Sequence, residues 1–198
     1  MVEDANFTLI VIEAILARMK YQSRELYLHL ARYNERANDE LFEVLSKLTD
    51  KARRRDTGSW FGSIHRLANH IIIADLFWLN RFKPIFPESR VLTDPRTFPQ
   101  DLSWQHDLRE EFGELREQRT FVDGRIIAWF EECPEDRYGD QFEYSDSAGN
   151  KLGAKAGQAF EFLFVHQIHH RGQLTQILDT IGLPNNIADN RAFLESPS

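Results

Sequence analysis

The clearest indication of the fold is in residues 157–181, GQAFEFLFVHQIHHRGQLTQILDTI. Apolar residues recur along this stretch at the spacing of an α-helix and form one stripe. The stripe consists of Ala159, Leu163, Ile177 and Ile181. Gly182 and Pro184 follow, and this pair is typical of the end of a helix. Since a long helix with one apolar face is stable only when that face is covered, the stretch predicts a bundle of helices.

Three other stretches have the same helical period. They cover residues 6–48, 58–82 and 103–132, with Ser59 and Ser103 as the predicted N-caps of the last two. The period slips at residues 20–23, which predicts a break in the first helix. Residues 90–101 contain prolines and predict a loop. The basic residues 51 and 53–55 are expected to complement the negative end of the first helix dipole.

A short hairpin is predicted between the third and fourth long helices. Residues 141–144 alternate with a period of two, residues 147–150 form a turn sequence, and residues 151–154 return. The expected fold class is therefore all-α, a four-helix bundle with one short β-hairpin before the last long helix and an extra N-terminal helical segment. We expect one domain, with an N-terminal arm at about residues 1–22, the bundle at about 23–183 and a polar tail at 184–198.

Composition restricts the classes of partner. The chain has 198 residues with 24 basic and 31 acidic side chains, so its net charge of −7 makes nucleic acid or an anionic membrane a poor partner. No apolar run is long enough to span a bilayer, and Glu3 and Asp4 occupy the region that is basic in a signal peptide. Cys133 is the single cysteine, which excludes an intrachain disulfide. The expected location is the cytoplasm.

Histidines provide the strongest functional signal. His166 and His170 lie in the middle of the apolar stripe of residues 157–181, with Gln173 beside them. In residues 58–82, His70 lies on the flank of the apolar stripe, whereas His65 is predicted to face outward. Burying imidazoles among apolar side chains is unfavourable unless each has a partner, and a divalent cation provides one for several at once.

His70, His166 and His170 are therefore the candidate metal ligands. The spacing of His166 and His170 places both rings on one face, one turn apart. Three neutral imidazoles leave one or two coordination positions open, as in catalytic zinc sites. Imidazole suits several metals, of which zinc and nickel are expected first. Gln167 occupies the position where the His-Glu-x-x-His motif requires glutamate, so that type of metalloprotease is not indicated. The alternative is that these are core histidines with ordinary hydrogen-bond partners.

Three polar residues are candidates for the pocket wall or for contacts behind the ligands. They are Asn34, Gln173 and Arg119. Asn34 lies in the apolar stripe of the first helix, and Arg119 lies close to the stripe of the third. The alternative for Asn34 is an inter-helix hydrogen bond, and the alternative for Arg119 is an exposed ion pair with Asp123. The sequence identifies no catalytic residue.

The motifs resemble those of the DinB/YfiT-like superfamily. Residues 164–173, FVHQIHHRGQ, match its H-x-x-H-H-R-G-Q signature. Residues 62–79 are similar to its second-helix motif, and residues 33–38 resemble its helix-one motif, with Arg36 where that family usually has tryptophan. The resemblance covers about residues 28–183. It implies a four-helix bundle, often dimeric, that holds a divalent metal through His70, His166 and His170. Relatives include transferases that depend on small cofactor thiols and a maleylpyruvate isomerase branch.

Three functions remain open from the sequence. The first is a metalloenzyme in which the metal activates water or a small thiol for hydrolysis or transfer on a small-molecule substrate. The second is a non-catalytic metal- or ligand-binding bundle. The third is an interaction protein without a metal, against which the core histidines argue.

A homodimer is the expected assembly. Residues 71–79 are apolar on nearly every side of their helix, and residues 7–16 are apolar at most positions. Such surfaces need a cover, which can be the N-terminal arm of the same chain or a second subunit. The family resemblance favours the second subunit.

Overall fold

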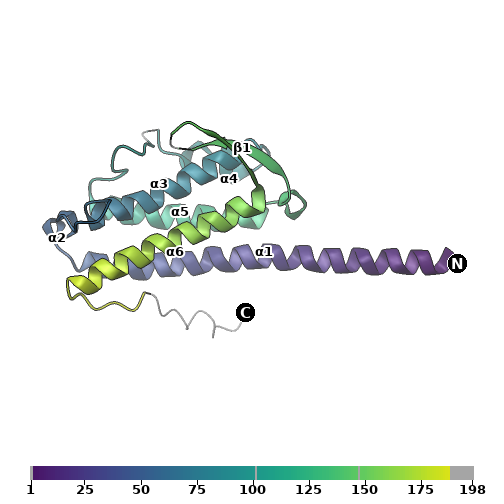
Figure 1. The fold of residues 1–198 in the computed structure, drawn as a ribbon, viewed down its shortest axis with the longest axis horizontal. Helices are drawn as coiled ribbons and strands as arrows, with labels where there is room; N and C mark the ends of the chain where they lie inside the picture. The colour runs from purple at the N-terminus through teal and green to yellow at the C-terminus, as the bar shows by residue number, and fades with distance from the viewer. Residues whose placement is uncertain (1, 101, 147, 188–198) are drawn as a thin grey trace.

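Four long helices form a bundle in this computed structural model (Figure 1). The structure describes the backbone of residues 2–100, 102–146 and 148–187, and within these ranges the side chains from residue 24 onward. The long helices are α1 (Val2–Ser46), α3 (Ile64–Phe82), α5 (Phe112–Glu132) and α6 (Ala156–Thr180). Both α1 and α3 pack against α5 and α6. No helix among the described residues has the length and apolar character needed to cross a membrane.

The predicted hairpin is confirmed. Strands β1 (Gln141–Ser145) and β2 (Lys151–Lys155) pair antiparallel, with Gln141 opposite Lys155. The hairpin lies directly before α6, as Figure 1 shows. The all-α fold class with a single hairpin is therefore correct.

The predicted break at residues 20–23 is wrong, because α1 is continuous. Helix continuity depends on backbone hydrogen bonds, and these four residues include no glycine or proline to interrupt them. The N-terminal half of α1 continues straight beyond the bundle and does not fold back over α3 (Figure 1). The side chains of residues 7–16, on which the argument for a covering arm rests, lie outside the described set.

Helix α3 begins later than predicted, at Ile64 rather than near residue 58. Gly58 and Gly62 adopt φ values of 69° and 79°, a left-handed conformation that an α-helix cannot contain. Ser63, and not Ser59, is the N-cap, and its hydroxyl accepts a hydrogen bond of 3.2 Å from the backbone N–H of Arg66.

Helix α5 also begins later than predicted, at Phe112 rather than near Ser103. The preceding segment is held along α3 by Asn69, whose Oδ1 accepts from the N–H of Arg109 at 2.9 Å. In return, Asn69 Nδ2 donates to the carbonyl of Arg109 at 3.2 Å. Because Asn69 engages this backbone, residues 102–111 remain non-helical and cover the side of α3 that the sequence pattern left open.

This segment also explains the incorrect prediction for His65. His65 is 1% exposed, and its Nε2 forms a 3.0 Å hydrogen bond with the carbonyl of Arg109. Burial lowers the pKa of His65, so the ring is neutral and structural. The middle of α3 is also covered by other parts of the chain, since Ile72 and Ile73 are 0% and 4% exposed and α3 packs against α5 and α6. The apolar patch expected on this helix is therefore buried within the chain.

Shorter helices occupy the connections. They are α2 (Asp50–Arg54), α4 (Arg90–Thr93) and the 3-10 turns η1 (Pro95–Thr97) and η2 (Glu135–Arg137), so the predicted loop at 90–101 is partly helical. Arg53 Nη1 donates to the carbonyl of Leu45 at 3.2 Å and also to that of Leu48. Leu45 lies in the last turn of α1 and Leu48 just beyond it, so Arg53 complements the C-terminal end of this helix, as the basic residues there predicted.

Candidate metal centre

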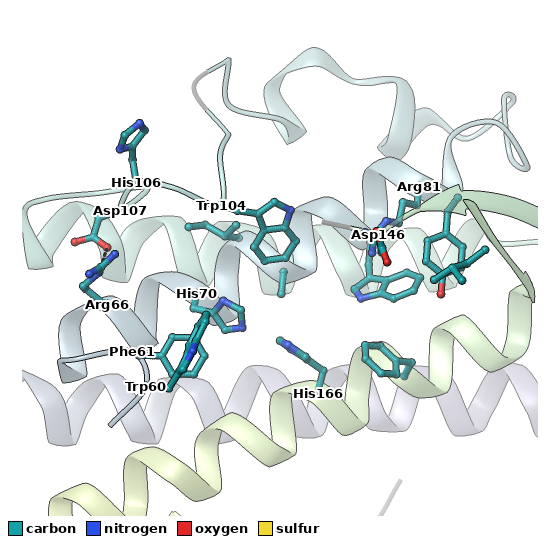
Figure 2. Close-up of a pocket in the computed structure, with 16 residues that line it drawn as sticks. Trp60, Phe61, Arg66, His70, Arg81, Trp104, His106, Asp107, Asp146 and His166 are labelled. Carbon is teal, nitrogen blue, oxygen red and sulfur yellow. Dashed lines mark ion pairs between the residues drawn. The ribbon is translucent and has the colours of Figure 1, made fainter. Parts of the chain in front are cut away.

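Three histidines from two helices meet at one point. His70 belongs to α3, whereas His166 and His170 belong to α6, and their candidate ligand nitrogens all lie within 4.8 Å of one another. The two Nε2 atoms of His166 and His170 are 3.0 Å apart. Figure 2 shows His70 and His166 directed toward each other across a cavity. The structure thus brings together the three histidines that the sequence selected.

The protonation state of the cluster is the one that binds metals. Burial lowers the pKa of His70 to about 4, and the nearby His170 lowers it further. Burial lowers the pKa of His166 to about 3, with added effects from His170 and His70. The pKa of His170 is also lowered by burial. All three rings are therefore neutral at pH 7, and a neutral imidazole has the lone pair that a cation requires.

Gln173 fixes the tautomer of His170. Its Oε1 lies 2.8 Å from His170 Nδ1, and an amide oxygen only accepts hydrogen bonds. Nδ1 therefore has the proton, and the Nε2 lone pair points toward His166. This contact behind a ligand is the type that orients metal-binding histidines in proteins.

The donor set fits a divalent cation such as zinc or nickel. Bonds of about 2.0–2.1 Å in a tetrahedral site place ligand nitrogens roughly 3.3 Å apart, close to the 3.0 Å between His166 and His170. His166 Nδ1 is buried without a hydrogen-bond partner. A cation bound to Nε2 of His166 would take the place of a proton on that atom, so the single proton of the neutral ring would be on Nδ1. Among the described residues, no other histidine and no cysteine or carboxylate joins this group.

A cavity of about 600 Å³ opens beside the histidines. It lies between α3 and α6, with His70 and His166 on its wall (Figure 2). Six of its lining residues carry phenyl, phenol or indole rings, namely Trp60, Phe61, Trp78, Trp104, Tyr144 and Phe162. Phe61 contacts two of the histidines, with ring centroids 4.5 Å from His70 and 5.3 Å from His170. This volume suits a small organic molecule.

A buried polar network lies behind the histidines on the other face of α6. Asp75 of α3 accepts from Arg119 Nη1 at 2.6 Å and from Gln167 Nε2 at 2.8 Å. Arg119 also donates twice to Asp123 on its own helix, at 2.8 Å each. Burial raises the pKa of Asp75 to about 6, and the Arg119 guanidinium opposes this shift. Asp75, Arg119 and Gln167 therefore connect α3, α5 and α6 through buried hydrogen bonds.

The network continues into α1 through Arg171. Its Nη2 donates to Asn34 Oδ1 at 2.6 Å, and its Nη1 donates to Asn38 Oδ1 at 3.1 Å. Asn38 Nδ2 in turn donates to Asp123 and to Gln167, each at 3.0 Å. All four long helices thus contribute a side chain. With two arginines and two aspartates, the network is formally neutral.

The structure places the three predicted pocket residues differently. Gln173 lies against His170, as expected for a residue behind a ligand. Asn34 and Arg119 lie in the buried network, 2% exposed each, and neither lines the cavity. Asn34 makes the inter-helix hydrogen bond of its alternative interpretation. The exposed ion pair proposed for Arg119 and Asp123 is wrong, because both side chains are buried.

Sequence reasoning missed four members of the network. They are Asn38, Asp75, Gln167 and Arg171. A signal was present for Asp75, the single charged residue among the apolar side chains of 71–79. Gln167 and Arg171 also stand one position after the paired histidines, at the same spacing of four. Two adjacent polar pairs on one helix indicate two functional faces.

A second group of possible ligands comprises His65, Asp107 and Glu110. His65 Nε2 already bonds the Arg109 carbonyl, and Asp107 lies 3.9 Å from that nitrogen. This geometry holds the 102–111 segment on α3 and engages the His65 nitrogen that lies nearest Asp107.

The comparisons with known proteins agree with this description. The family model of the DinB family matches residues 19–197. The chain is 21% identical over 165 residues to the protein named DinB of Bacillus subtilis (strain 168), which covers 83% of this chain and 91% of that protein. No solved structure gives a significant match.

Proposed function

Since the chain belongs to the DinB family, we propose that it is a metal-dependent enzyme in which His70, His166 and His170 hold a divalent cation. One observation supports this proposal above the others, the convergence of three neutral imidazoles beside a cavity that two of them, His70 and His166, line. We expect zinc or nickel, because both accept imidazole nitrogen in sites with few ligands. The substrate is a small molecule that enters the cavity.

The bound cation supplies Lewis acidity, which lowers the pKa of a water or a small thiol and so allows hydrolysis or group transfer. The chain contributes position and environment. Gln173 orients His170, and aromatic side chains line the space in front of the histidines. Cys133 cannot be the thiol, because it is buried and burial raises its pKa to about 12. A thiol, if used, is therefore a cosubstrate.

Chemistry is favoured over a purely structural metal site. Structural sites are closed by four protein ligands, whereas among the described residues this group has three. An open coordination position beside a cavity has a role only if a substrate, cosubstrate or water binds there.

The unpaired Cys133, which needs no oxidising compartment, supports a cytoplasmic location.

Metal analysis of purified variants tests the proposal. Wild-type protein is expected to hold about one equivalent of metal, and His166→Ala is expected to hold far less at the same free metal concentration. His106→Ala is the matched control, because His106 also lines the cavity but is exposed and outside the ligand group. Equal metal content in the two variants would refute the site. Loaded wild type is then screened with small electrophiles, with and without small thiols, against His166→Ala.

A further inference from the structure

The cavity has a second polar end, which the metal proposal does not use. At the end away from the histidines, Arg81 of α3 lines the cavity together with Trp78 and Tyr144 (Figure 2). Its guanidinium carbon lies 4.6 Å from the Trp78 ring centroid and 4.9 Å from that of Tyr144. These two rings hold the guanidinium in a defined place.

Arg81 keeps most of its hydrogen-bonding capacity. Among the described residues, its side chain makes one hydrogen bond, from Nη2 to the carbonyl of Ser145 at 2.9 Å. A guanidinium has five N–H groups, and two parallel ones match a carboxylate. Burial lowers the pKa of Arg81, so this partly desolvated cation gains from an anionic partner.

Asp146 lies beside Arg81, and its charge partly offsets the lowering of the Arg81 pKa, but its carboxylate forms no direct contact with the guanidinium among the described residues. Its Oδ1 accepts from the backbone N–H groups of Ala148 and Asn150, at 2.9 and 2.8 Å. Its Oδ2 accepts from Asn150 Nδ2 at 2.9 Å. The carboxylate is therefore engaged within its own turn, and no ion pair joins it to Arg81 in the described part of the chain.

The distance between the two ends sets the size of the ligand. His70 and Trp78 stand on the same helix, and their separation corresponds to roughly 12 Å along its axis. A ligand that reaches from the histidines to the guanidinium above Trp78 therefore needs a body on the order of 10 Å. A single benzene ring with a carboxylate is too short.

The walls between these ends suit flat rings. Trp104 stacks on Phe77 with centroids 4.3 Å apart and an interplanar angle of 6°, which presents a flat surface. Trp78 and Phe162 also line the cavity and contact each other, with centroids 5.3 Å apart. Aromatic pairs gain beyond simple burial of area, so these walls favour an aromatic body over an alkyl chain.

We propose that the cavity binds an elongated carboxylic acid with an aromatic body, its carboxylate on Arg81 and its opposite end at the three histidines. The assignment of the histidine end as the reacting end rests on the proposed function. The carboxylate end does not, because Arg81 and its stacking partners are independent of any metal.

Calorimetry and tryptophan fluorescence with biphenyl-4-carboxylate test this inference. The probe is compared with its carboxamide, which lacks the charge, with benzoate, which is too short, and with decanoate, which is not aromatic. Arg81→Gln is expected to weaken binding of the biphenyl acid about ten- to hundredfold and to leave the affinity for the carboxamide within about twofold of wild type. Arg66→Gln is the matched control, since Arg66 lines the same cavity near Asp107 and is expected to change neither.

Several outcomes overturn the inference. They are no binding of the biphenyl acid to wild type, equal binding to Arg81→Gln with an unchanged thermal unfolding midpoint, and decanoate or benzoate binding as tightly as the biphenyl acid. Arg81→Lys, which keeps the charge, is expected to recover part of the affinity. If Arg81→Gln fails to fold, Arg81→Lys and the acid-to-amide ratio in wild type decide the matter.

The two proposals fail separately. Acid binding is measured in loaded protein, in protein stripped by a chelator and in His166→Ala, and it is expected to persist in all three. Loss of metal binding with retained acid binding contradicts the proposed function alone. Normal metal loading without a preference for the acid over the amide contradicts the carboxylate anchor alone.

Discussion

Asp75→Asn is the most informative single perturbation of the buried network. Asp75 is 1% exposed and accepts hydrogen bonds from Arg119 at 2.6 Å and from Gln167 at 2.8 Å. The substitution keeps the shape of the side chain but removes one of two negative charges that balance two buried arginines. The network then holds a net positive charge in a site that water does not reach.

The magnitude follows from that imbalance. Breaking a buried ion pair by removing one partner costs about 3–5 kcal/mol, a large part of the roughly 5–15 kcal/mol that stabilises a typical domain. With a urea m-value of about 2 kcal/mol/M, the midpoint of unfolding is expected to fall by roughly 1.5–2.5 M. We expect the variant to fold, since Arg119 retains both hydrogen bonds to Asp123.

Urea unfolding followed by circular dichroism measures this shift in the metal-free protein. Asp140→Asn is the control, because Asp140 pairs with Arg137 at 3.0 Å on the surface, and exposed pairs contribute about 0–1 kcal/mol. A midpoint for Asp75→Asn within error of that control would refute the view that the network is a stabilising, charge-balanced unit.

Three further predictions concern the site and the assembly. Gln173→Ala should weaken metal binding about 10–100-fold with little loss of stability, because it frees the His170 tautomer, and an unchanged affinity in metal titrations would contradict this role. The pKa values of His70 and His166 are lowered from 6.5 to about 4 and about 3, so as the pH falls the unfolded chain takes up protons before the folded one. Metal-free protein should therefore lose the stability that these neutral rings contribute between about pH 6.5 and pH 4, on the order of 2 kcal/mol after allowance for partial exposure, while Asp75, with its pKa raised to about 6, acts in the opposite direction. A change in urea midpoint from pH 7.5 to pH 4.5 that is the same in wild type and in His70→Ala would argue against buried neutral rings. Light scattering should give a homodimer of twice the 23.2 kDa chain mass. Val165→Glu places a charge at a 61% exposed apolar position on α6 and should shift the protein toward the monomer. A wild-type mass near 23.2 kDa would reject the dimer.

The sequence predicted the helices better than their starting points. Helical periodicity located four long helices because burial of one face leaves a repeating pattern. It failed at residues 58–63, where two left-handed glycines delay α3, and at 103–111, where Asn69 captures the backbone of Arg109. That capture joins residues 40 positions apart, and no local pattern encodes it.

The histidine cluster could be predicted from helical periodicity, whereas the burial of His65 could not. His70, His166 and His170 lie on faces that the apolar stripes define, so their direction follows from helical geometry. The burial of His65 depends on a non-helical segment that covers the opposite face of α3. Periodicity within one helix cannot report on a cover that comes from elsewhere in the chain.

Helix α6 connects the histidine cluster with the buried polar network. His166 lines the cavity with His170 beside it, and their immediate successors, Gln167 and Arg171, face the buried network. Adjacent residues on a helix point about 100° apart, so a rotation of α6 that moved the histidines would also pull Gln167 from Asp75 and Arg171 from Asn34. The network therefore fixes the rotation of the helix. We infer that the network, together with the hydrogen bond between Gln173 and His170, holds the imidazoles in position before any cation enters the site.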